Sequence, residues 1–122
     1  MKKLTLCLTL FVALCATALV GVAVADNHEG TWNGEVVDLA CYVASNAKGP
    51  DHAGCAKTCV KNGQPMGLLT DDGTLVLLAA DHKNGDPYES LKDLAGEKAS
   101  VTGSLAERDG MKIVTVTGSK AG

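Results

Sequence analysis

The sequence predicts a small all-β domain: a five-stranded, OB-fold-like Greek-key barrel with a helical, cysteine-containing insert after the first strand. Three observations predict it. Five short runs are apolar or alternate in hydropathy, glycine-containing turns join two pairs of these runs, and a helix signal falls between the third and fourth. With 122 residues, of which 46% are hydrophobic, one globular domain is expected.

The first strand and the insert are expected in the first half of the domain. Residues 31–40 read as a strand, because β-branched side chains occupy their centre. A loop is expected over residues 45–50, and a short helix over residues 51–61. In that helix Asp51 is the expected N-cap, and Asn62-Gly63 forms the stop signal.

A hairpin and a second helix follow. Apolar runs at residues 66–70 and 74–80 flank Asp71-Asp72-Gly73, which is a strong hairpin signal. Residues 87–94 are expected to form a helix, because proline stands in its first turn and apolar side chains recur on one face. Gly96 stands just past its end.

The last two strands are expected at residues 98–106 and 111–117, joined by a turn at residues 108–110. The resulting order is strand, helical insert, strand, strand, helix, strand, strand. This is the connectivity of an OB-fold. An unrelated α+β arrangement is the alternative.

Residues 1–25 are predicted to be a secretory signal peptide. A basic start at Lys2-Lys3 precedes an uncharged run over residues 4–24, which ends in the small-x-small pattern of residues 23–25. Cleavage would leave residues 26–122 as a single OB-fold-like domain in the bacterial periplasm or outside the cell. An uncleaved membrane anchor is the alternative.

Composition excludes several functions. The formal net charge is −3 and the chain has only four aromatic residues, so neither a basic groove nor a stacking platform for nucleic acid is expected. The sequence has no nucleophile elbow, no zinc-protease motif and no glycine-rich phosphate loop. It therefore predicts neither an enzyme nor a nucleic-acid partner, and no membrane association after cleavage of the signal.

The main candidate site is a set of cysteine and histidine residues. His52, Cys55 and Cys59 stand at positions i, i+3 and i+7, which fall within an arc of about 60° on a helix. Cys41, at the expected end of the first strand, would complete the set. Three thiolates and one imidazole suit Zn(II) or Cu(I), so copper or zinc is the predicted cofactor.

Two other interpretations of the cysteines stay open. In an oxidising compartment Cys41 could form a disulfide with Cys55 or Cys59, which would staple an OB module that binds a small ligand or a protein partner. A thiol-redox role is the third interpretation. The metal site is preferred because a disulfide leaves one thiol of the three unexplained.

Other side chains are secondary candidates. If the signal is cut after Ala25, the new amine, the following amides and the imidazole of His28 form a square-planar nitrogen set for Cu(II) or Ni(II). Asp38 could orient a metal ligand as a hydrogen-bond acceptor, or could be an ordinary strand residue. Met66 is expected in the core rather than as a thioether ligand, and His82 in a solvated loop.

Most of the mature chain resembles a group of small exported bacterial proteins of uncharacterised function. The segments that carry this resemblance are Gly34 to Tyr42, His52 to Cys59 and Gly63 to Leu69, and the Cys/His block is the most specific of them. The resemblance implies a secreted OB-like domain. It implies no activity. Together these observations predict an exported protein that binds a soft metal for buffering, delivery or sensing, with a periplasmic protein partner.

Overall fold

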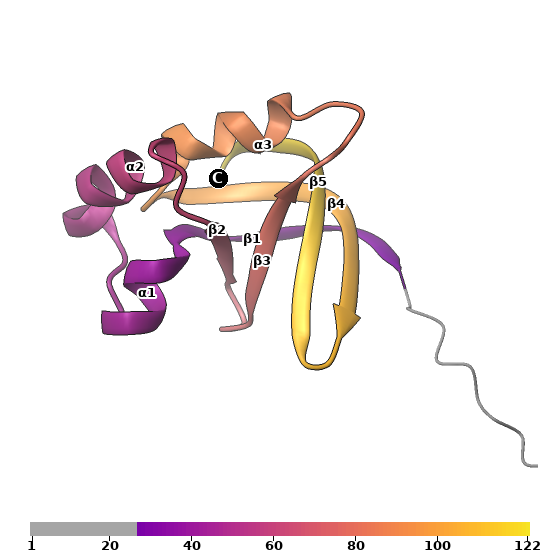
Figure 1. Cartoon of the computed structure of the whole chain (residues 1–122), viewed down its shortest axis with the longest axis horizontal. Coiled ribbons are helices and arrows are strands. Elements are labelled where there is room, and N and C mark those ends of the chain that lie inside the picture. The colour runs from indigo at the N-terminus through magenta and orange to yellow at the C-terminus, as the bar shows by residue number, and fades with distance from the viewer. Residues whose placement is uncertain (1–26) are drawn as a thin grey trace, which may run out of the picture.

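The computed structural model describes residues 27–122, and the predicted signal peptide lies outside the described residues. In these residues five strands form one barrel, and several short helices lie outside it (Figure 1). The elements are, in order, β1 (His28–Asp38), α1 (Leu39–Ser45), a 3₁₀ turn (Pro50–His52), α2 (Ala53–Lys61), β2 (Met66–Thr70), β3 (Leu75–Ala80), α3 (Asp86–Leu91), a 3₁₀ turn (Lys92–Leu94), β4 (Lys98–Arg108) and β5 (Met111–Ala121).

The strands close into a barrel in the order β1-β2-β3-β5-β4. Only β3 and β5 run parallel, and every other neighbouring pair is antiparallel. The predicted all-β, OB-fold-like barrel is confirmed, including the hairpin at residues 71–73 and the helix between the third and fourth strands.

β1 pairs with two other strands of the barrel. Its first part pairs with β4 and its last part with β2, and Gly34 has a partner on each side, Thr70 and Ala99. A side chain at Gly34 would collide with the backbone of Leu69. The glycine therefore lets β1 bend between its two neighbours, and the bend carries the end of β1 to the insert.

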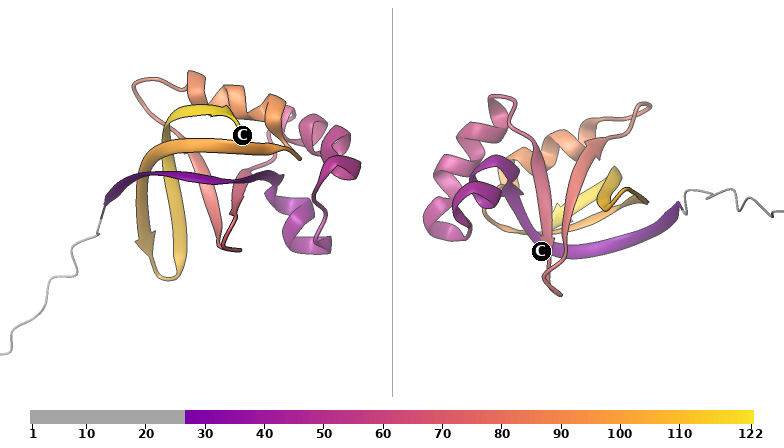
Figure 2. Two further views of the ribbon diagram at one scale, coloured as in Figure 1. Left: turned by 180° about the vertical axis from the view of Figure 1, so that it is seen from behind. Right: turned by 60° about the horizontal axis from the view of Figure 1, so that its bottom comes forward.

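The core fills the barrel and extends under the helices. Met66, Leu68 and Leu91 are the largest of its fully buried apolar side chains. α2 contributes Ala56 and Val60 to the same cluster. Figure 2 shows α3 across one end of the barrel and α1 with α2 together beside it. None of the helices within residues 27–122 is long and apolar enough to cross a membrane.

The insert differs from the sequence-based expectation. The first strand ends at Asp38 rather than at residue 40, and the next seven residues form α1, which was not predicted. The cause is the Asp38 side chain, which caps α1 by accepting from the backbone N–H groups of Ala40 and Cys41. The expected N-cap at Asp51 was also wrong, because this residue lies inside the 3₁₀ turn that precedes α2.

Candidate metal-binding site

Three potential metal ligands meet where β1 ends and the insert begins. Asp38 is the last residue of β1, Cys41 lies in the first turn of α1, and His52 closes the 3₁₀ turn before α2. One ligand atom from each lies within 4.8 Å of the other two. Ligand atoms around one zinc ion stand about 3.3–3.8 Å apart, so small side-chain rotations would bring this group to coordination distance.

Asp38 is the most deeply buried member, with 1% of its surface exposed. Its Oδ1 accepts from the backbone N–H of Ala40 at 3.0 Å and of Cys41 at 3.3 Å. Its Oδ2 is buried and has no hydrogen-bond partner within the part of the chain that the structure describes. A buried carboxylate oxygen without a partner is costly, and a bound cation would remove that cost.

His52 shows the same pattern. Its Nε2 is buried without a hydrogen-bond partner among residues 27–122. Its backbone N–H donates to the carbonyl of Gly49, and the N–H of Gly49 in turn donates to the Glu35 carboxylate of β1. These hydrogen bonds connect the loop to the barrel and position the backbone of His52.

Cys59 adjoins the group and Cys55 lies next to Cys59. Both stand on α2, whose buried face is formed by Ala56 and Val60, and Cys59 is half-buried while Cys55 is exposed. The Asp38 side chain, burial and the Cys55 thiol together raise the pKa of Cys59 to about 11. Cys59 therefore interacts with both the buried carboxylate of Asp38 and the exposed thiol of Cys55.

The Asp38 carboxylate and the thiols of Cys41 and Cys59 shift one another's pKa. The pKa of the Cys41 thiol is raised, first by the Asp38 side chain, then by burial and by the charges of Asp38 and Cys55. Burial opposes ionisation of Asp38, but interactions with the Cys41 and Cys59 thiols and with backbone N–H groups outweigh it and lower its pKa. Without metal, neutral thiols therefore face an ionised carboxylate, and a metal ion would displace the thiol protons.

The structure brings together only part of the predicted set. Cys41 and His52 belong to the group within 4.8 Å, whereas Cys55 and Cys59 lie outside it. The cysteines at positions 41, 55 and 59 are free. The disulfide of the alternative interpretation, between Cys41 and Cys55 or Cys59, is therefore not formed among these three residues.

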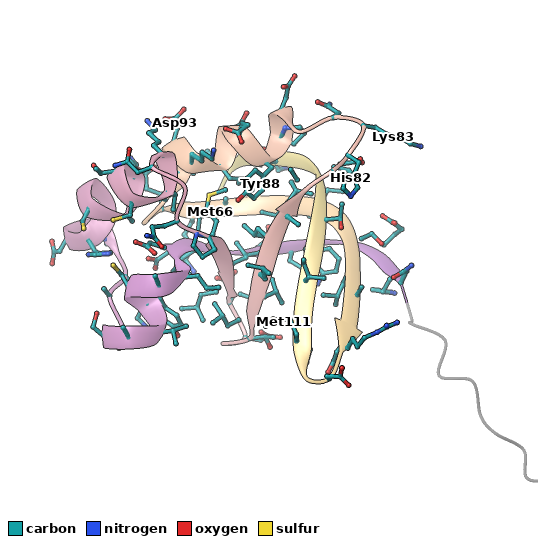
Figure 3. All side chains as sticks on the ribbon, in the orientation of Figure 1. Met66, His82, Lys83, Tyr88, Asp93 and Met111 are labelled. Atoms are coloured by element: carbon teal, nitrogen blue, oxygen red, sulfur yellow. The ribbon has the colours of Figure 1, made fainter. Side chains whose placement is uncertain are left out.

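Apart from Asp38, the secondary candidates are not part of this group. His28 is exposed at the start of β1 and pairs with Leu105, whereas Asp38 is the last residue of this 11-residue strand. Residue 26, the first position of the proposed amino-terminal motif, lies outside the described residues. His82 is exposed in the loop after β3, on the side of the molecule away from α1 and α2 (Figure 3). Met66 is fully buried in the core, as expected.

Sequence reasoning treated Asp38 as a neighbour of a ligand rather than as a ligand. The signal was its place directly after the buried pair Val36-Val37, where a charged side chain needs a partner. Its proximity to Cys41 could not be derived without α1, because an extended chain would carry the two side chains apart.

Fold and site together define a small OB-fold-like barrel with an Asp-Cys-His group able to hold a metal ion. Compared with protein-family models, curated proteins and solved structures, the chain matches none of them.

Proposed function

We propose that this protein is an exported metal-binding protein that holds one Zn(II) ion through Asp38, Cys41, His52 and Cys59. The observation that carries the proposal is the pair of buried atoms without hydrogen-bond partners in the described chain, Asp38 Oδ2 and His52 Nε2. Both belong to side chains that, with Cys41, can offer ligand atoms to one point. A bound cation would give both buried atoms a partner.

The donor set favours zinc over copper. Carboxylate oxygen is a common zinc ligand, whereas Cu(I) prefers thiolate and thioether sulfur. The total charge of the four ligands also favours zinc. With both thiols ionised, the four ligands carry three negative charges, of which Zn(II) balances more than Cu(I) does. Cu(I) is the alternative, and it would draw Cys55 into the set in place of Asp38.

The proposed role is buffering, delivery or sensing rather than catalysis. Catalytic zinc has three protein ligands and an open position, whereas four protein ligands form a closed site. Cys59 is proposed as the fourth ligand because it interacts with Asp38 and lies next to the group. Export is proposed from the signal-peptide pattern, and the mass of protein recovered from the periplasm would show whether cleavage follows Ala25.

The test is a zinc titration of the protein as the cells make it, kept reduced and followed by native mass spectrometry and chelator competition. We expect one Zn(II) per chain. Asp38→Asn, Cys41→Ser and His52→Ala should each weaken binding by on the order of tenfold or more. The matched control is His82→Ala, which changes an exposed histidine far from the group and should leave affinity unchanged.

Two results would overturn the proposal. One is a wild-type protein that takes up no stoichiometric zinc. The other is binding that survives in both Cys41→Ser and His52→Ala. Preferential uptake of Cu(I) from an equimolar mixture would replace zinc by copper.

A further inference from the structure

The cysteines of the insert differ in their access to solvent. Cys55 is exposed, whereas Cys41 and Cys59 are half-buried and Asp38 is fully buried. Of these groups, the Cys55 thiol is therefore the nearest to solvent and the Asp38 carboxylate is the most deeply buried.

Cys55 is nevertheless close to the inner thiols. It stands one helical turn before Cys59 on α2, at the spacing that places side chains on one face. It also contributes to the raised pKa of Cys59 and of Cys41. An ion bound at Cys55 would thus be within a short step of at least two deeper ligands.

The surface around Cys55 is open. A side-chain carbon built on the neighbouring Gly54 would meet no atom within 4 Å. The two lysines of α2 are turned to the far side, where Lys57 pairs with Glu97 and Lys61 with Asp93. Because Cys55 itself is exposed, a second molecule can approach it directly.

Resting on the proposed function, we infer that Cys55 is an exchange ligand, through which the ion passes between the buried site and a thiol-bearing carrier. In loading, the zinc–sulfur bond to the carrier breaks as a zinc–sulfur bond to Cys55 forms. The proton of the Cys55 thiol passes to the released carrier thiolate, and no electron is transferred. The ion then moves to the deeper ligands, and Cys41 and Cys59 each lose their thiol proton as a zinc–sulfur bond forms. One of these protons passes to the released Cys55 thiolate and the other to solvent. Zinc accommodates such steps because it can expand from four to five ligands.

The chemistry of the partner follows from that of Cys55. A thiol carrier can hand zinc from its own sulfur to the sulfur of the exposed Cys55. A carrier with only oxygen ligands would have to reach the half-buried thiols. The expected partner is therefore a small thiol or a protein with an exposed cysteine.

The experiment measures zinc affinity and zinc exchange separately. The zinc-loaded full chain is mixed with a chromogenic zinc chelator, with and without millimolar glutathione, and release is followed by stopped flow. Affinity is measured by competition at equilibrium. For Cys55→Ser we expect glutathione-stimulated release at least tenfold slower than in wild type, with a dissociation constant unchanged within threefold. Cys59→Ser is the matched variant on the same helix, and it should weaken affinity by tenfold or more.

Each other outcome contradicts the inference. A Cys55→Ser protein that exchanges zinc at the wild-type rate shows that exchange uses another path. A loss of affinity as large as that of Cys59→Ser makes Cys55 a resident ligand. If Asp38→Asn and His52→Ala weaken binding while Cys55→Ser exchanges normally, the proposed function stands and only this inference fails. If wild type binds no zinc, both fail.

Discussion

Asp38 and Cys41 are joined in two ways. The Asp38 carboxylate accepts a hydrogen bond from the backbone N–H of Cys41 at 3.3 Å, and ligand atoms of the two side chains lie within 4.8 Å of each other. The first relation starts α1, and the second belongs to the candidate site. One carboxylate thus both determines where the strand becomes a helix and faces the thiol that this helix presents.

The two roles of Asp38 can be separated by two substitutions. Asp38→Asn keeps an oxygen that can cap α1, because asparagine caps helices about as well as aspartate. It removes the negative charge. We expect α1 to stay capped in the metal-free protein, with zinc affinity lower by on the order of tenfold or more.

Asp38→Ala removes the cap as well, and should cost about 1 kcal/mol of unfolding free energy in the metal-free protein beyond Asp38→Asn. Urea unfolding and zinc competition on the same two proteins check both statements. Equal zinc affinity in Asp38→Asn and wild type would contradict the assignment of Asp38 as a ligand.

The barrel could be predicted from the sequence because its signals are local. The hairpin around Asp71-Asp72-Gly73 and the turn at residues 108–110 lie between runs of strand type, and both are confirmed. The connectivity then followed from the order of the elements.

In the insert, the sequence predicted the helix α2 but not α1. The reason is that α1 has only seven residues and depends on one side chain for its start. Helices this short gain little from intrinsic propensity, so the sequence carries a weak signal for them. Cys41 and His52 were identified by residue type. Their distance from Asp38 depends on α1 and on the loop anchored to Glu35, and neither leaves a periodic pattern.

Gly96 supports the position of α2. Its φ is +82°, and a side-chain carbon there would lie 2.5 Å from Cα of Ala53, the first residue of α2. Gly96→Ala should therefore displace the start of α2 and the adjacent His52. We expect a loss of about 1–3 kcal/mol in unfolding free energy together with weaker zinc binding.

The control for this substitution is Gly110→Ala. Gly110 has the same φ of +82°, but a side-chain carbon there would meet nothing within 4 Å. It should show the backbone strain alone, with unchanged zinc affinity. Equal losses of unfolding free energy and equal zinc affinities in the two variants would contradict the importance of the close approach between Gly96 and Ala53.

Met66 should act through packing alone. It is fully buried in the core and pairs with Asp38 across β1 and β2. Met66→Ala is expected to lower the unfolding free energy by about 2–5 kcal/mol, as for other buried methionines. Met111, 60% exposed, is the matched control, and Met111→Ala should stay within about 0.5 kcal/mol of wild type. Zinc affinity of the folded fraction should not change in either variant. A selective loss of zinc binding in Met66→Ala would indicate a thioether ligand.

The stability of the metal-free protein should fall at alkaline pH. The pKa of Cys59 is raised from an ordinary value of 9.0 to about 11, chiefly by the Asp38 side chain. The unfolded chain therefore loses this proton at lower pH than the folded chain, and binds fewer protons between about pH 9 and 11. Unfolding free energy falls with pH wherever the unfolded state binds fewer protons, so this contribution is complete below pH 9 and lost by about pH 11. The raised pKa of Cys41 acts in the same direction.

Asp38 gives the opposite dependence at the acid end. Its pKa is lowered from 3.8, so its contribution is present above that value and is lost as the carboxylate is protonated at lower pH. Urea unfolding from pH 3 to 11, in chelator and reductant, measures both limits. Cys59→Ser should flatten the alkaline decline while leaving the acid limit in place. A decline between pH 9 and 11 that is identical in Cys59→Ser and wild type would show that Asp38 and Cys59 are not coupled in solution.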